Sequence, residues 1–213
     1  MARPKTTTGE SATARRILAA AEQHFAAQGI AGARTKNIAS AAHANKAMLF
    51  YYFGDKRRLH RAVLENLFRQ LRAGVYAAAA RPGGSPRERL LEFITSYFDF
   101  LASHPNYPRL VHREAMESTK DFQWIVRDHL RPSHNRLVRT IEEGIRAGEF
   151  RNVDPDHTAF TIMGMTTSYF AAAPILSEVA GRDLMAPKAL VTRKRALLDF
   201  LNYGLMRSKV RTR

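Results

Sequence analysis

The sequence predicts an all-α protein of about nine helices. Apolar residues recur at helical spacing along most of the 213 residues, and no segment alternates apolar and polar residues long enough to form a convincing strand. Hydrophobic residues make up 45% of the chain, which is enough for a packed core. The breaker residues 81–86 (Arg-Pro-Gly-Gly-Ser-Pro) predict a domain boundary at this point.

Four helices are predicted before this boundary. The first spans 13–28 and ends at Gly29, a residue that commonly terminates helices. Two short helices follow at 35–42 and 45–52, and a connecting helix begins at Asp55 and runs to about residue 80. The tight break between the two short helices predicts a helix-turn-helix, whose second helix lies in the major groove of DNA.

Five helices are predicted after the boundary, each bounded by a start or stop signal. Ser85 and Pro86 begin the first, and Pro132 is expected to kink or break the third. Pro174 interrupts the fourth. The expected spans are 86–103, 107–118, 121–147, 155–173 and 187–207.

Positive charge gathers at the two ends of the chain. The formal net charge is +15, and residues 1–60 hold ten Lys and Arg against three acidic residues. Residues 187–213 hold eight against one, whereas the middle is nearly balanced. Such basic regions are typical of phosphate contact, although they also serve solubility. Basic residues of the two tails (Arg3, Lys5, Lys209, Arg211 and Arg213) are either DNA-contacting arms or solvated ends.

The helix-turn-helix segment supplies the candidate DNA-binding residues. Thr35 is expected to cap its first helix and Asn45 its second, which places Lys46 at the N-terminus that reaches base edges. Phosphate contacts are expected from Lys46, Tyr52 and Lys56, and base contacts from Ala47, Met48 and Tyr51. The full predicted set is Thr35, Lys36, Asn45, Lys46, Ala47, Met48, Tyr51, Tyr52 and Lys56.

This segment resembles the TetR family of transcriptional regulators. The family pattern is matched by Thr35, Ile38, Ala39, Ala42, Tyr52, Phe53, Lys56 and Leu59. Three positions depart from it: His43 and Ala47 stand where glycines are usual, and Phe50 replaces a tyrosine. A histidine tolerates a left-handed turn better than a β-branched residue does, so we expect the turn to be kept.

The resemblance implies two domains and a mode of action. Residues 1–60 would bind a palindromic operator, and residues 86–213 would bind a small-molecule effector and form a homodimer through the final helix pair. The dimer seam would be Leu197, Leu198, Leu201 and Leu205, unless this stripe packs within its own subunit. The candidate pocket residues are Phe93, Tyr97, Phe100, His112, Met116, Trp124, Met163, Thr167 and Tyr169.

Two features of the candidate pocket remain open. Each of its residues also suits an ordinary core, because large apolar side chains are usually buried. Arg109, Arg113 and Arg127 could bind an anionic ligand, but neighbouring acidic residues (Glu114, Glu117 and Asp128) could pair with them instead.

Other classes of function find little support. The chain has no cysteine, no Gly-rich phosphate loop and no His-Glu-x-x-His, so we predict no enzyme, cofactor or metal site. His129 and His134 are five residues apart and do not share a helical face. A non-specific architectural DNA-binding protein is the alternative, although the large second domain argues against it. No apolar run is long enough for a membrane span, and we expect a cytoplasmic protein.

Overall fold

The computed structural model describes residues 8–76, 83–117 and 120–207. In these residues the fold is helical, as predicted, apart from one antiparallel bridge between Phe150 and Met206. The α-helices are α1 (Thr8–Gly32), α2 (Thr35–Ala41), α3 (Lys46–Phe53), α4 (Lys56–Leu71), α6 (Pro86–Ser103), α7 (Asn106–Glu117), α8 (Lys120–Ile125), α9 (Arg131–Arg146), α10 (Pro155–Ala171), α11 (Ala173–Ala180) and α12 (Pro187–Gly204).

Two π-helical segments extend these helices. The first, η1 (Arg72–Tyr76), continues α4, and the second, η2 (Val126–Leu130), joins α8 to α9, so the described residues form ten continuous helical segments. Residues 81 and 82 of the predicted boundary lie outside the described residues, and so do the basic tails with Arg3, Lys5, Lys209, Arg211 and Arg213.

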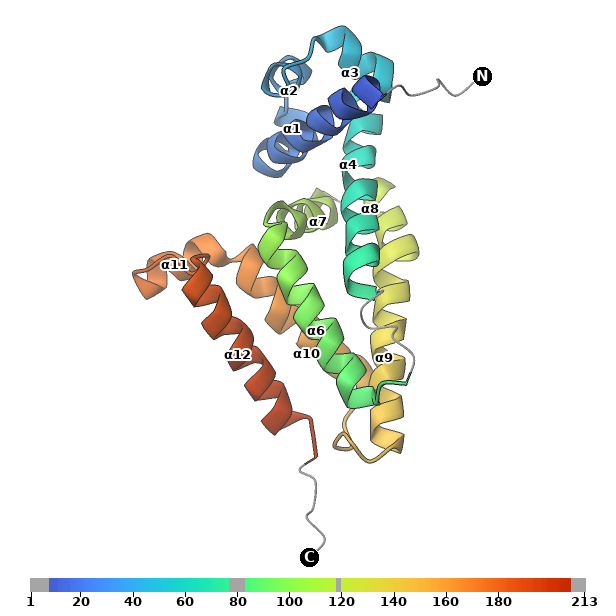
Figure 1. The fold of residues 1–213 in the computed structure, drawn as a ribbon, viewed down its shortest axis with the longest axis vertical. Coiled ribbons are helices and arrows are strands. Elements are labelled where there is room, and N and C mark those ends of the chain that lie inside the picture. The colour runs from blue at the N-terminus through green and yellow to red at the C-terminus, as the bar shows by residue number, and fades with distance from the viewer. Residues whose placement is uncertain (1–7, 77–82, 118–119, 208–213) are drawn as a thin grey trace, which may run out of the picture.

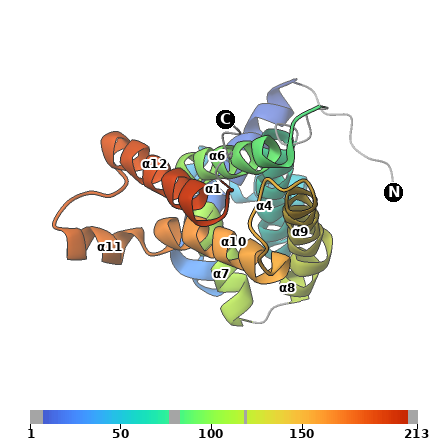
Figure 2. The same cartoon turned by 90° about the horizontal axis from the view of Figure 1, so that it is seen from below.

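Helices α1 to α3 form a small head at one end of the molecule, and α4 runs from the head into the larger domain (Figure 1). Helix α1 packs on α4 and α7, so the head contacts the second domain directly. Seen from below, α11 and α12 stand at one edge of the larger domain, and α8 and α9 stand at the opposite edge (Figure 2).

The helix-turn-helix packs as its apolar spacing predicts. Phe25, Ile38 and Leu49, from α1, α2 and α3, are fully buried and share one core. His43 adopts a positive φ of 49° in the turn, the conformation for which the family uses glycine. Arg16 of α1 donates from Nε to the carbonyl oxygen of Ala42 at 3.1 Å, which fixes the turn against α1.

The larger domain begins and bends at the predicted residues. Ser85 accepts a hydrogen bond from the backbone N–H of Glu88, whose carboxylate accepts from the Ser85 N–H, and these two bonds form a capping box for α6. The 121–147 helix is not broken at Pro132. Instead its backbone widens into η2 just before the proline, because a proline cannot donate to the carbonyl four residues earlier.

Most residues of the predicted dimer seam are buried within a single chain. Leu197, Leu201 and Leu205 are buried within their own chain, with Leu201 only 4% exposed, and Leu198 is half-buried. Their side of α12 packs on α6, where Lys194 also pairs with Asp99 of α6 at 2.6 Å. This packing favours the intrachain alternative for this stripe. The side of α12 open to a partner carries different residues, Val191, Phe200 and Tyr203.

Gly144 of α9 is required by close packing, and its substitution should strongly destabilise the protein. A Cβ atom at this position would overlap ring carbons of Phe150, which is fully buried. We expect Gly144→Ala to lower the free energy of unfolding by about 3 kcal/mol, measured by urea denaturation. Gly204→Ala is the matched control, because a Cβ there meets no atom within 4 Å. Equal stability of the two variants would contradict this account.

In the described residues, no single helix is long and apolar enough to cross a membrane. By length and composition alone, α10 and α11 together would suffice, but they are bent by 73°.

Candidate DNA interface and effector pocket

Helix α3 presents an open face at the end of the head. Leu49 points into the core, whereas the exposed residues are Lys46, Ala47, Phe50 and Tyr51. Tyr51 is 61% exposed, and the Lys46 ammonium lies 5.5 Å from the centre of the Phe50 ring. This short helix combines a cation, two exposed aromatic rings and a small residue on the side away from the core.

The N-terminus of α3 is capped as predicted. Asn45 has an extended backbone, and its Oδ1 accepts a hydrogen bond from the backbone N–H of Met48 at 2.8 Å. This bond satisfies one of the free N–H groups of the first turn and fixes where the helix begins. Met48 and Tyr52 are half-buried, and the Tyr52 ring packs edge-on to Tyr51 at 5.2 Å.

Thr35 does not occupy the predicted capping position. Arg34 stands at the N-cap of α2 without a side-chain hydrogen bond, and Thr35 is the first residue of the helix. The extended backbone at Arg34 explains the difference, because the helix starts one residue earlier than a Thr35 cap would require. Thr35 is half-buried and Lys36 is fully exposed, at the N-terminus of α2.

Lys56 has a structural partner that the sequence does not reveal. Its ammonium donates to the carbonyl oxygens of Ala31 and Ala33, at 3.3 and 3.2 Å, where α1 ends. Asp55 caps α4 by accepting from the backbone N–H of Arg58 at 2.8 Å. The Lys56 side chain therefore joins the start of α4 to the end of α1, since helix C-termini leave carbonyls without partners.

Removing this ammonium should destabilise the head. We expect Lys56→Ala to lower the free energy of unfolding by about 1 kcal/mol, because two carbonyls lose a charged but half-exposed donor. Lys56→Arg, which keeps a donor, should recover most of the loss. Urea denaturation followed by circular dichroism measures both variants, and an unchanged midpoint for Lys56→Ala would show that these bonds contribute nothing.

The nine predicted pocket residues do not line one cavity. Phe93, Tyr97 and Thr167 belong to one region, where Phe93 stacks on Tyr97 at 5.9 Å and the Tyr97 hydroxyl lies 3.0 Å from Thr167 Oγ1. Phe100 stacks on His104, and the Tyr169 hydroxyl donates to a backbone carbonyl, so both belong to the packed interior. Met163 is half-buried against the core.

The remaining three residues lie nearer the head. Trp124 packs edge-on to Phe68 at 6.2 Å and to His129 at 4.7 Å, beside α4. His112 and Met116 line an open depression on α7, and Met116 is 86% exposed, so this methionine is not part of the core. Solvent reaches Met116 because α7 packs its other side on α1.

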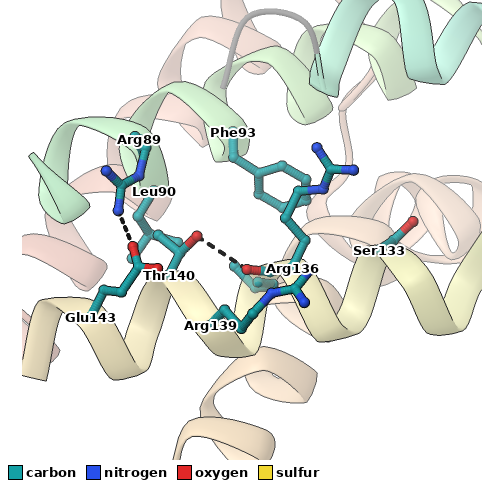
Figure 3. A pocket seen from close by; sticks show the side chains of 9 residues that line it. Arg89, Leu90, Phe93, Ser133, Arg136, Arg139, Thr140 and Glu143 are labelled. Atoms are coloured by element: carbon teal, nitrogen blue, oxygen red, sulfur yellow. Dashed lines mark hydrogen bonds and ion pairs between the residues drawn. The ribbon is translucent and has the colours of Figure 1, made fainter. Parts of the chain in front are cut away.

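A pocket of about 350 Å³ lies between α6 and α9 (Figure 3). The side chains from the two helices face each other across it, and Arg89 of α6 pairs with Glu143 of α9. Leu90 and Phe93 give it an apolar wall, while α9 adds two further cationic side chains. The lining residues are Arg89, Leu90, Phe93, Ser133, Arg136, Leu137, Arg139, Thr140 and Glu143.

The sequence analysis did not predict the cationic side of this pocket, which is formed by Arg89, Arg136 and Arg139. Two of the three arginines predicted from the sequence pair with acidic neighbours: Arg113 lies 3.7 Å from Glu117, and Arg127 lies 2.6 Å from Asp128 and so holds the pKa of that carboxyl below its usual value. Arg109 lines the open depression on α7. The signal that could have found the pocket is the spacing of Arg136, Arg139 and Glu143, which places all three on one side of α9.

Comparison with known families decides the identity. A family model described as "Bacterial regulatory proteins, tetR family" matches residues 17–63, and one described as "Tetracyclin repressor-like, C-terminal domain" matches residues 86–201. The chain belongs to the TetR family. It is a transcriptional regulator rather than an enzyme, and regulators of this family bind DNA operators and small-molecule effectors and act as dimers.

Relatives of this TetR-family regulator cover most of its length. It is 26% identical to the HTH-type transcriptional repressor NicS of Pseudomonas putida, over 90% of this chain and 91% of that protein. It is 28% identical to the HTH-type transcriptional regulator RutR of Escherichia coli, over 82% of this chain and 81% of that protein.

Solved structures show the same fold. The ketosteroid transcriptional regulator KstR2 of Mycobacterium tuberculosis superposes with a TM-score of 0.77 at 19% identity, covering 96% of this chain and 98% of that chain. A tetR-family regulatory protein from Rhodococcus RHA1 gives a TM-score of 0.75 at 22% identity, covering 95% and 100%.

Proposed function

We propose that this regulator is a repressor that binds a palindromic operator as a homodimer and leaves it when a small organic anion binds. The observation that carries the proposal is the exposed face of α3, with Lys46, Ala47, Phe50 and Tyr51 around a capped N-terminus. A helix of this width fits the major groove, and cations at its start are suited to phosphate contact. Because the proposed target is chromosomal DNA, the proposed location is the cytoplasm.

The proposed division of roles within the head follows the exposure of its side chains. Lys46 and Tyr52 contact phosphates, and Ala47, Met48 and Tyr51 contact base edges. Thr35 and Lys36 contact phosphate at the N-terminus of α2. Lys56 supports the head through its bonds to the end of α1 and has less freedom to reach DNA.

The homodimer is proposed to form through the outer side of the last long helices. Phe160 of α10 and Val191, Phe200 and Tyr203 of α12 are large apolar or aromatic side chains that remain exposed in a single chain. Helix α12 stands at the edge of the molecule opposite α8 and α9, whereas α10 lies between this edge and α9, on which it packs (Figure 2). Two copies joined at this edge would bury the exposed side chains around a two-fold axis and mirror the symmetry of a palindrome.

The effector site is proposed to be the pocket between α6 and α9. Its wall of Leu90, Phe93 and Leu137 suits an apolar body, and the guanidinium groups of Arg136 and Arg139 suit a carboxylate, which arginine binds well. One acidic side chain, Glu143, is already paired with Arg89. An excess of cationic groups around an apolar wall favours a small organic anion over a neutral or cationic compound.

A route from this pocket to the head runs through η2. Ser133 and Arg136 also line a smaller neighbouring pocket with His129 and Phe68. The His129 ring stacks on Phe68 of α4 at 4.0 Å, and its Nδ1 accepts from Arg72 at 2.8 Å. Burial lowers the pKa of His129, so the ring is neutral and can accept this bond. A ligand that shifts α9 would therefore change contacts on α4. It would release DNA if it binds the DNA-incompetent arrangement more tightly than the DNA-binding one.

The test begins with selection of bound fragments from genomic DNA. A footprint on one palindrome supports a specific regulator, whereas uniform coating would support the architectural alternative. Aromatic and short aliphatic carboxylates are then compared with the corresponding neutral amides for release of the selected fragment. Carboxylates should release DNA, and Arg139→Ala should raise the concentration required about tenfold, since a hydrogen bond to a charged group is lost. Equal potency of the amides would overturn the anionic effector.

Trp124, the only tryptophan in the sequence, should report on effector binding through its fluorescence. Trp124 packs on His129, which lines the pocket next to the proposed effector site. A carboxylate that releases DNA should therefore change the fluorescence of Trp124 at the same concentrations. If release leaves the emission unchanged, the route through η2 is not the one used.

A further inference from the structure

Three ionisable side chains meet where the head joins the larger domain. His60 of α4, Glu114 of α7 and Asp121 of α8 are all buried, and each offers a ligand atom within 4.8 Å of the other two. His60 Nε2 lies 3.2 Å from Glu114 Oε1. The helices that carry them come together below the head (Figure 1). This cluster lies apart from the pocket between α6 and α9 and from the exposed side of α3.

Two buried carboxylates meet one imidazole in this cluster. Glu114 and Asp121 are both acidic, and both side chains are buried beside the His60 ring. Arg61 reaches Asp121 at 3.3 Å, but the same guanidinium also bonds Glu65 at 3.1 Å. Carboxylates taken out of water are costly unless a cation accompanies them. His60 Nδ1 is also buried, with no hydrogen-bond partner.

We propose that His60, Glu114 and Asp121 bind one divalent transition-metal ion, for which Zn²⁺ is the probe of choice. An imidazole nitrogen and two carboxylate oxygens form a ligand set that suits this ion. Ligand atoms around tetrahedral zinc lie about 3.4 Å apart, given bonds of about 2.0–2.1 Å. The spacing of His60 and Glu114 already meets this requirement, and two carboxylates match the charge of the ion.

Arg61 supports the site from outside. Its guanidinium bonds Asp121 and lies 4.1 Å from the centre of the Trp124 ring, so it holds the carboxylate in place as outer partners of metal ligands do. The three ligands come from three helices, and α4 carries the head. A bound ion would therefore fasten the head to α7 and α8, independently of any effector in the other pocket.

The experiment uses the full chain after treatment with EDTA and dialysis. Zn²⁺ is titrated in competition with a chromophoric chelator, and the melting temperature is recorded with and without the ion. The wild type should bind one Zn²⁺ per chain and melt at a higher temperature when loaded. Glu114→Gln and Asp121→Asn should each weaken binding at least tenfold, since each removes an anionic ligand.

A surface pair supplies the matched control. His134 lies 2.7 Å from Asp156, so this pair also offers an imidazole and a carboxylate. It has only two potential ligands, and its side chains are more exposed than those of His60, Glu114 and Asp121. His134→Gln should leave the affinity unchanged. Co²⁺ bound in place of Zn²⁺ should give visible absorption bands in the wild type that Asp121→Asn alters, a readout that does not depend on stability or on DNA binding.

Three results would overturn the site. They are no Zn²⁺ binding by the wild type at micromolar concentrations, unchanged binding by both Glu114→Gln and Asp121→Asn, and loss of binding in His134→Gln alone. If Glu114→Gln fails to fold, Asp121→Asn decides, because the Asp121 side chain is the most exposed of the three at 12%.

Discussion

Replacing Phe200 by arginine should convert the protein to a monomer and weaken operator binding about 100-fold or more. Phe200 is 63% exposed on the outer side of α12, within the proposed dimer interface. In a two-fold interface the substitution occurs twice, so two guanidinium groups would be buried without partners. A single head then holds only a half-site and loses the gain from simultaneous binding of both heads. Sedimentation velocity and operator titration measure the two effects.

The neighbouring residue supplies a contrast. Leu201 is 4% exposed and packs inward, so Leu201→Arg should prevent folding rather than release folded monomers. Met116→Arg changes an exposed apolar side chain on α7, away from the proposed interface, and should leave the dimer intact. A Phe200→Arg variant that sediments as a dimer would exclude this side of α12 as the interface.

These residues also show how far the sequence could predict α12. Its apolar spacing correctly indicated a helix with a leucine stripe, but large side chains are also exposed outside this stripe, with Phe200 and Tyr203 on one flank of the helix and Val191 on the other. Periodicity shows which residues share a side, not which side meets a partner. That choice depends on α6, which covers the leucines and leaves the aromatic side chains exposed.

Features of the head that depend on neighbouring residues could be predicted from the sequence. The cap at Asn45 and the left-handed turn at His43 depend on neighbouring residues only, and the structure has both. Lys56 was harder, because its partners Ala31 and Ala33 are more than twenty residues away. A basic residue near DNA-binding helices suggests phosphate contact, and only the fold reveals that backbone carbonyls compete for it.

The two clusters in the larger domain were outside the reach of sequence patterns. Arg89 meets Glu143 only because α6 packs on α9, and the chain between them gives no motif. The ligands of the proposed metal site are likewise spread along the chain, at 60, 114 and 121. Metal motifs recognised from sequence rely on short spacings within one helix or loop, so a three-helix site escapes them.

Lys46→Glu should weaken binding to every DNA sequence by about 100-fold for the dimer, or roughly tenfold for each head. Lys46 is exposed at the N-terminus of α3, with its ammonium 5.5 Å from the centre of the Phe50 ring, so its replacement should not affect folding. Loss of one phosphate contact per head should also make the dependence of log K on log salt shallower by about two for the dimer. Arg146→Glu, a charge reversal at an exposed residue of α9, is the control.

Met48→Ala should change the sequence preference of binding rather than its salt dependence. A methionine can contact a thymine methyl but cannot make paired hydrogen bonds, so we expect about 1 kcal/mol of lost discrimination at one or two positions of each half-site. The salt dependence should stay the same, because no phosphate contact is removed. Titrations of operator and scrambled duplexes over a salt series measure both variants. If Lys46→Glu alters the preferred sequence while Met48→Ala changes only the salt dependence, α3 does not lie in the major groove as proposed.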